Sequence, residues 1–341
     1  MGIKPIQHLY ALFNDDPNVN YSNAFLDFLN KFCGSAMRQT EISYYFGNQG
    51  WESALGAPVE EVVNKFKNEL LIRKADTRND NKQLASSALS VKELKTLLKQ
   101  FNLKASGKKD ELIDRMQEHF PDALAHALPK GDFYVATQKG LDLASKRQSE
   151  KKATKEATEV KILGLLKAAL VEEAIETWNT YSSSEPFSST ISPEHLSREA
   201  SIINTILKSS CKYLRNRLSS EQVDRIRVLS AIRHLCGKSL SHRANEALKP
   251  VIQKFNEGNS GTHAETASRM LRFYAIGEAN LSSFKKMGYD LIQISSCSDS
   301  CEFCKTNSGI KHPISIAPEL PHEKCNHELG CRCTYQIALN T

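Results

Sequence analysis

The cysteines near the C-terminal end of the chain have the types and spacing that most directly indicate chemistry. Cys301 and Cys304 form a Cys-x-x-Cys pair, which lets two thiolates converge on one tetrahedral metal ion. The segment 321–335 then supplies further candidate ligands, namely His322, Cys325, His327, Cys331 and Cys333. The sequence therefore predicts a zinc site, and the alternative is several free buried thiols in one short polar loop.

This segment offers more candidate ligands than one zinc ion can use. The first choice is the set Cys301, Cys304, Cys325 and Cys331. Cys333 is the next candidate and His322 follows it, whereas Cys297 is expected outside the coordination shell. Four protein ligands leave no position for an activated water, so the predicted zinc is structural.

The remaining cysteines and the absence of targeting signals suggest a reducing compartment. Cys33, Cys211 and Cys236 stand alone among apolar neighbours and are expected in the core. The first residues lack the charged and apolar regions of a secretory signal. The apolar stretch 163–171 is interrupted by Lys167 and is too short to span a bilayer. We expect a cytoplasmic protein with no membrane segment and no disulfide framework.

A capping box marks the start of an amphipathic helix in the first half of the chain. In Ser90-Val-Lys-Glu93 the hydroxyl and the carboxylate can each satisfy a free amide of the first turn. One face of the predicted helix is apolar and consists of Val91, Leu94, Leu97, Leu98 and Phe101, while the other faces carry Lys92, Lys95 and Lys99.

A turn and a second short helix follow this first helix. The segment 102–107 ends in a glycine, and Ser106 is predicted to cap the second helix. That helix directs Leu112, Ile113, Met116 and Phe120 inward, and Pro121 ends it. The prediction is a helix-turn-helix with a small apolar core, which would depend on support from flanking segments.

The segment 89–116, which reads LSVKELKTLLK and then LKASGKKDELIDRM, closely resembles the SAP motif. The resemblance implies binding to duplex DNA, commonly AT-rich, through the turn and the basic start of the second helix. The DNA contacts that it implies are Lys104, Ser106, Gly107, Lys108 and Lys109, with Arg115 in support. The alternative is a structural helical hairpin with a solvated basic face.

The lysines at the start of the second helix add a physical hint. Their charges oppose the helix macrodipole and contribute nothing to stability, and a bound phosphate would relieve that conflict. The formal net charge of +6 is too small to argue for nucleic acid by itself. A single module with few phosphate contacts is also expected to bind weakly, because few counterions are released.

Length and composition predict a mainly α-helical protein with several domains. The chain has 341 residues, of which 40% are hydrophobic and 25% charged, so global disorder is not expected. A strand at 132–137 makes a winged-helix element, with the SAP-like segment inserted into it, one candidate for the first half; a helical bundle with a stray strand is the other. The segment 146–156 has no apolar anchor and is either a solvated helix or a linker.

The predicted domain organisation follows from these elements. In chain order we expect a helical region at 1–84, the SAP-like motif at 85–122, a strand and helix at 123–147 that complete the first domain, a linker at 148–159, a helical domain at 160–288 and a zinc-binding tail at 289–341.

The tail, with the helix 264–274 and the strand 290–294 before it, resembles the C-terminus of phage head-morphogenesis proteins of the Mu F-like group. The shared features are a Cys-x-x-C-like pair, the later Gly309, and a Pro-His stretch that runs into Cys-Arg-Cys. This chain departs from the group by extra residues between His322 and Cys331 and by its SAP-bearing first half. The resemblance implies a phage or prophage origin, with phage or nucleoprotein components as further partners.

The sequence contains none of the common catalytic motifs. It lacks a Walker loop, a Rossmann fingerprint, a zinc-protease helix and a nucleophile elbow, and the histidines near the cysteines are not laid out as an HNH-type nuclease. The leading prediction is a non-enzymatic DNA-binding protein. A phage structural protein and an unrecognised enzyme, such as a nuclease, are the alternatives. The basic residues Arg215, Arg217, Arg225, Arg227, His242 and Arg243 would extend a DNA track or form a solvated face.

Overall fold

The computed structural model describes residues 21–47, 49–77, 79–188, 190–257 and 262–338, and it is mainly α-helical. The described chain divides into two compact units. The first unit contains the residues up to Lys151 together with 184–188, and the second contains 152–183 and the residues after Ser188. No helix in the described ranges is long and apolar enough to cross a membrane.

The first unit is built around a cluster of aromatic side chains. Its elements outside the SAP-like segment are α2 (Asn23–Leu29), η1 (Asn30–Phe32), β1 (Met37–Arg38), α3 (Gln39–Phe46), α4 (Gln49–Leu55), α5 (Val59–Asn68), β2 (Ile72–Lys74) and β3 (Phe133–Ala136). Phe28 and Phe66 are fully buried, with ring centroids 5.6 Å apart, and Phe32 lies 5.8 Å from Phe66. Their spacing on α2 and α5 follows the helical period, so each helix turns one apolar face inward.

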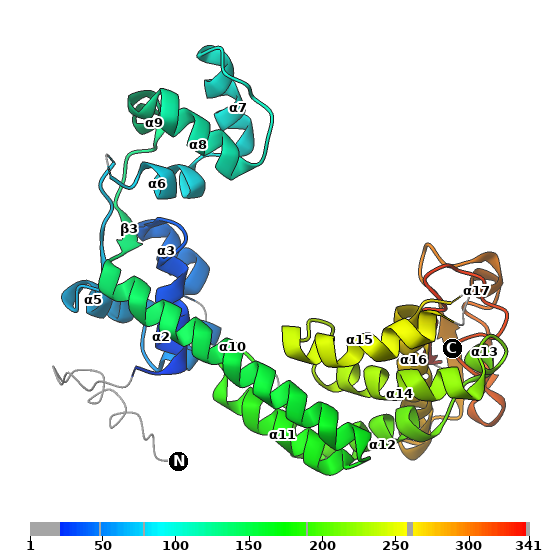
Figure 1. Cartoon of the computed structure of the whole chain (residues 1–341). Coiled ribbons are helices and arrows are strands. Elements are labelled where there is room, and N and C mark those ends of the chain that lie inside the picture. The colour runs from blue at the N-terminus through cyan, green and yellow to red at the C-terminus, as the bar shows by residue number, and fades with distance from the viewer. Residues whose placement is uncertain (1–20, 48, 78, 189, 258–261, 339–341) are drawn as a thin grey trace. The chain divides into compact units, whose positions relative to one another are not determined.

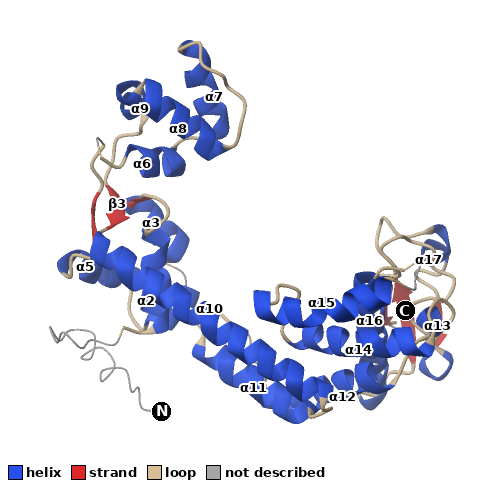
Figure 2. Ribbon diagram, in the orientation of Figure 1, coloured by secondary structure: helices blue, strands red, loops and turns tan. Residues whose placement is uncertain are grey.

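Three short strands form an antiparallel sheet in the order β1-β3-β2, and β3 confirms the strand predicted at 132–137. Tyr134 of β3 lies between Met37 and Lys74. A helix, a strand, further helices and two strands follow each other along the chain, which agrees with the winged-helix arrangement considered above. The SAP-like segment is inserted between β2 and β3, and Figure 2 shows β3 next to α3.

The inserted segment forms four helices, which Figure 1 shows gathered together. They are α6 (Asn81–Ala88), α7 (Val91–Gln100), α8 (Lys109–His119) and α9 (Pro121–Ala127). Their own apolar core contains Leu94, Leu98, Leu112 and Met116. A second, smaller cluster places Leu84 of α6 with residues of β3, so the module rests on the sheet as the size of its core requires.

The segment predicted as the linker 148–159 is helical, because α10 runs without interruption from Gln138 to Lys167. The physical reason is that the segment is rich in Lys, Glu and Ala, which favour helix, and contains no proline or glycine. It is also held by charged anchors that an apolar pattern cannot reveal. Buried Arg147 contacts Asp27 of α2 and Glu185, at 3.2 Å and 2.6 Å. The boundary between the units falls inside this helix, after Lys151.

The second unit packs its helices and the cysteine-rich segment into one core. Its helices beyond α10 are α11 (Val171–Ser184), α12 (Pro193–Lys208), α13 (Lys212–Arg215), α14 (Ser220–Leu235), α15 (His242–Asn256) and α16 (Ala264–Lys286). They confirm the helical pattern predicted for 160–288. Cys304, Cys325, Cys331 and Cys333 belong to the same buried cluster as these helices. The segment after 289 is therefore packed onto the helices and does not form a separate tail.

Short elements frame the cysteines. They are β4 (Leu291–Ser295), α17 (Glu302–Thr306), β5 (Lys311–Pro313), η2 (Ile314–Ile316) and β6 (Thr334–Ile337). The strands pair antiparallel in the order β5-β4-β6. Ile292 and Ile294 of β4 are buried, and Tyr335 of β6 lies against Gly277 of α16, where a Cβ would approach the tyrosine ring to 3.1 Å. This close contact fixes the end of the cysteine segment on the helical layer.

Candidate nucleic-acid interface and metal centre

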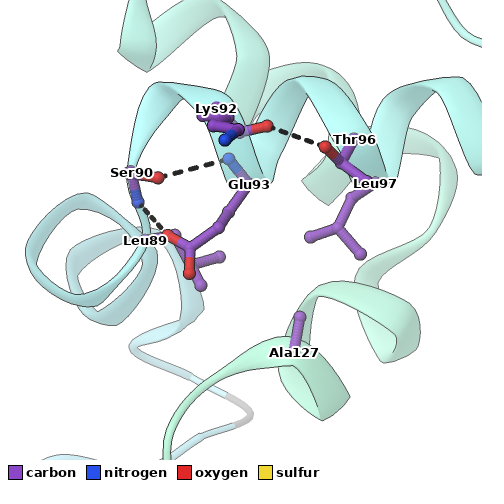
Figure 3. Close-up of a pocket in the computed structure, with 7 residues that line it drawn as sticks. All are labelled: Leu89, Ser90, Lys92, Glu93, Thr96, Leu97 and Ala127. Carbon is purple, nitrogen blue, oxygen red and sulfur yellow. Dashed lines mark hydrogen bonds between the residues drawn. The ribbon is translucent and has the colours of Figure 1, made fainter.

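The capping box predicted at Ser90 is present at the start of α7. The Glu93 amide donates to Ser90 Oγ at 3.2 Å, and the Ser90 amide donates to Glu93 Oε2 at 2.6 Å, as Figure 3 shows. The contact with Ser90 holds the pKa of the Glu93 carboxyl below its usual range. An open groove of about 530 Å³ lies beside this helix start, and Leu89, Leu97 and Ala127 form its apolar part. The cap therefore fixes where α7 begins.

The turn between α7 and α8 is held by Arg115. Its guanidinium Nη1 donates to the carbonyl of Lys104 and to that of Ser106, the latter at 3.3 Å. Gly107 adopts a φ of +133°, and a Cβ there would lie 2.4 Å from the Glu111 carboxylate. Only glycine fits this position without strain. Arg115 and Gly107 thus shape the turn and present its backbone.

The start of α8 differs from the prediction, because the N-cap residue is Lys108 and not Ser106. The Glu111 carboxylate accepts a hydrogen bond of 3.2 Å from the Lys108 amide. Asp110 and Glu111 both lie in the first turn, where negative charge complements the helix macrodipole. These two carboxylates offset the unfavourable effect of the lysines on the helix macrodipole. The position of the lysines is therefore no independent evidence for a bound phosphate.

The predicted DNA-contact lysines are placed in two different ways. Lys104 and Lys108 are exposed, as are Ser106 and Gly107, and neither ammonium group has a protein partner among the described residues. Lys109 is half-buried, and its Nζ donates to the carbonyl of Ser86 in α6 at 2.6 Å. Lys109 thus ties α8 to α6, which leaves Lys104 and Lys108 as the cations available to a ligand.

The cysteines near the C-terminus converge as the metal prediction requires. Two groups have all their sulfur atoms within 4.8 Å of one another, namely Cys301, Cys304 and Cys325, and Cys304, Cys331 and Cys333. Cys301 and Cys325 lie 3.8 Å apart, and Cys304 and Cys331 lie 3.9 Å apart. Tetrahedral zinc with Zn–S bonds of about 2.3 Å separates its sulfurs by about 3.8 Å. The sulfur positions therefore fit a metal ion, and Cys304 is common to both groups.

His322 and Cys297 lie outside both sulfur groups. The His322 ring is buried, its Nε2 has no hydrogen-bond partner among the described residues, and its main-chain amide donates to Cys331 Sγ at 3.4 Å. Burial lowers the pKa of this histidine. Exposed Cys297 lies 3.9 Å from the carbonyl of Arg332. Cys333 belongs to a sulfur group and His322 does not, and the ranking of the two as ligands stays a prediction.

The thiols of the cluster differ in how readily they ionise. Burial raises the pKa of the Cys304 thiol. At Cys331 the hydrogen bond with Cys325 lowers the pKa, but the hydrogen bond with Cys333 and burial outweigh it, so the pKa is raised there too. Cys301 is the exception. Burial opposes its ionisation, but the amides of Cys304 and Asn326 and the neighbouring thiols lower its pKa to about 7. A thiolate at Cys301 is available near neutral pH as a first ligand.

The loop that carries Cys325 is fastened by contacts that the sequence did not reveal. Arg217 donates to the carbonyls of Glu323 and Cys325, at 2.9 Å and 3.0 Å, and its guanidinium lies 4.0 Å from the ring centroid of Tyr213. Tyr335 donates to the carbonyl of Pro318 at 2.6 Å. Side chains of the helical layer and of β6 therefore hold the loop in place.

Most of the basic residues considered for a DNA track have structural roles. Arg217 holds the cysteine loop, Arg227 pairs with Asp224 at 2.8 Å, and Arg225 pairs with Glu221 at 2.5 Å. Arg243 is largely exposed, with a 3.7 Å contact to Glu156. Each of these arginines therefore has a partner within the second unit.

Comparison with known families identifies one module of the chain. The family model of the SAP domain matches residues 85–121. No curated protein matches the chain. The resemblance to Mu F-like phage proteins has no support in these comparisons. The chain therefore contains a SAP domain, a module that implies nucleic-acid binding, together with a cysteine cluster able to hold a metal ion.

Proposed function

We propose that the protein binds double-stranded DNA through its SAP domain and that zinc at the cysteine cluster stabilises the second unit. The observation that carries the DNA proposal is the pair of exposed lysines, Lys104 and Lys108, on a turn that Arg115 and Gly107 hold in one conformation. A preordered turn with two exposed cations suits phosphate oxygens, which accept hydrogen bonds from ammonium groups.

Duplex DNA is the proposed nucleic acid because the module offers a rigid helical surface. Single-stranded nucleic acid is usually bound by aromatic side chains that stack on bases. In this module Phe101 and Phe120 stack on each other, with ring centroids 4.4 Å apart, so each ring has at most one face left for a base. Binding mainly through phosphates predicts a moderate affinity that falls as salt rises.

The zinc proposal assigns four of five converging sulfurs, with Cys301, Cys304, Cys325 and Cys331 as the set. Bound zinc would crosslink α17 to the loop before β6 and would supply folding energy, because the ligands converge only in the folded chain. A set of four protein ligands gives the ion no open position for a reaction. The proposed protein is therefore a binding protein and not a metalloenzyme.

The test is a gel-shift titration of labelled duplex with the full chain and the double variant Lys104→Ala/Lys108→Ala. If each lysine neutralises one phosphate, the slope of log affinity against log salt should fall by about 2, with at least tenfold weaker binding at low salt. The matched control is Lys95→Ala/Lys99→Ala, which removes two exposed lysines from α7. Lys109 should be left intact, because its contact with Ser86 makes its loss a test of stability.

Equal affinities of the wild-type chain and the Lys104/Lys108 variant would remove the turn as the contact site. If the control pair weakened binding as strongly, the interaction would be a general effect of charge. A phage-assembly role would instead require a capsid partner for the metal-bearing segment, and no contact or comparison favours it. Stronger binding to single strands than to duplex would overturn the choice of ligand.

A further inference from the structure

Three arginines of the second unit gather where α14 packs against α16. Arg269 and Arg272 are one turn apart on α16, and Arg233 lies in the last turn of α14. Arg233 pairs with Glu265 in the first turn of α16, which places the end of α14 beside that helix. Residues 265, 269 and 272 share one face of α16, so the three guanidinium groups belong to one region.

These arginines have hydrogen-bond donors that lack an acceptor. The Nε atoms of Arg233, Arg269 and Arg272 are all buried and have no hydrogen-bond partner in the described chain. The Arg233 side chain is only 14% exposed. A buried donor without an acceptor is costly, and a charged one more so. Three in one region indicate that an acceptor is missing.

The negative charge near these residues does not balance them. Glu265 contacts Arg233 and is itself half exposed, and Arg269 donates to the carbonyl of Leu329. No carboxylate contacts Arg272 among the described residues. Burial and then the positive charge of Arg269 lower the pKa of Arg272. Burial and then the positive charge of Arg272 lower the pKa of Arg233. The cations therefore repel one another in a partly desolvated place.

We propose that Arg233, Arg269 and Arg272 form a binding site for a phosphate group. Arginine presents its donors in a planar fork that matches phosphate oxygens, and the negative charge would offset the mutual repulsion of the cations. The phosphate comes from a nucleic-acid backbone or from a small phosphate compound. This site lies in the second unit and does not depend on DNA binding by the SAP domain.

The first experiment measures thermal unfolding of the full chain in inorganic phosphate and in sodium chloride of equal ionic strength. Phosphate at roughly ten times its dissociation constant should raise the melting temperature by about 3–5 °C. Arg272→Gln should abolish this rise. In chloride the Arg272→Gln variant should melt no lower than the wild type, because the substitution removes a positive charge that no carboxylate contacts. The control is Arg243→Gln, at a side chain that is 77% exposed.

A second experiment identifies the source of the phosphate by gel shift with labelled duplex. If the site binds the DNA backbone, Arg272→Gln weakens duplex binding about tenfold, and it does so also in the Lys104→Ala/Lys108→Ala background. If the ligand is a small phosphate compound, duplex affinity is unchanged while the phosphate-dependent rise in melting temperature is lost. The proposal fails if phosphate stabilises the wild type no more than chloride does, or if Arg272→Gln keeps the full rise.

Discussion

Replacing Cys304 by serine tests the metal centre at the sulfur that both groups share. The sulfur separations of 3.8 Å and 3.9 Å match the edge of a tetrahedral zinc–thiolate site. Apparent zinc-binding free energies of about 10–16 kcal/mol for structural sites correspond, shared among four ligands, to about 3 kcal/mol for each sulfur. Cys304→Ser should therefore weaken zinc binding at least a hundredfold.

The assay is competition with a chromophoric chelator, combined with elemental analysis of the purified proteins. Wild-type chain and Cys297→Ser, the matched control, should each retain one zinc per chain. Cys333→Ser should weaken binding less than Cys304→Ser does if Cys333 is the sulfur outside the coordination shell. An affinity of Cys304→Ser within tenfold of the wild type would refute the assignment, and so would a wild-type chain that takes up no zinc.

Two further predictions concern the first unit. Gly107→Ala should destabilise the SAP domain by about 2 kcal/mol, because alanine is strained at this φ and its Cβ meets the Glu111 carboxylate; urea unfolding that matched the wild type would contradict this. Hydrogen bonding to Arg73 lowers the pKa of Asp80. The ion pair of these two residues therefore contributes its full stability at pH values above the unfolded-state pKa of about 4. That stability is lost as the pH falls through the lower folded-state pKa. Asp80→Asn should cost about 1 kcal/mol near neutral pH, since Arg73 is half exposed, and nothing in strong acid; a loss of stability independent of pH would be inconsistent with the ion pair.

Local signals in the sequence predicted the parts of the site that short-range chemistry determines. The capping box at Ser90 depends only on residues three apart, and the glycine turn before α8 depends on one backbone position. The Cys-x-x-Cys spacing likewise brings Cys301 and Cys304 together through one turn of chain. Each of these features was therefore predictable without knowledge of distant packing.

Several contacts that the sequence did not reveal join residues far apart in the chain. Lys109 looked like a DNA contact, but its ammonium reaches Ser86 because α6 packs beside α8. Arg147 looked like part of a solvated segment, although Glu185 and Asp27 bury it. The ligand choice stayed open for the same reason, since spacing alone does not say which sulfurs of the final segment approach Cys304.

The insertion of the SAP domain between β2 and β3 bears on the order in which the first unit folds. Pairing of Lys74 with Tyr134 closes a loop of about 60 residues, whereas the folded module leaves only about 12 connecting residues outside its helices. The closure entropy then falls by about 1.4 kcal/mol, which favours strand pairing about tenfold. The helices of the module contact near neighbours in sequence and can form quickly. We expect the helices of the module to form early and to shorten the connection across which β2 and β3 pair, while the sheet in turn supports the small core of the module.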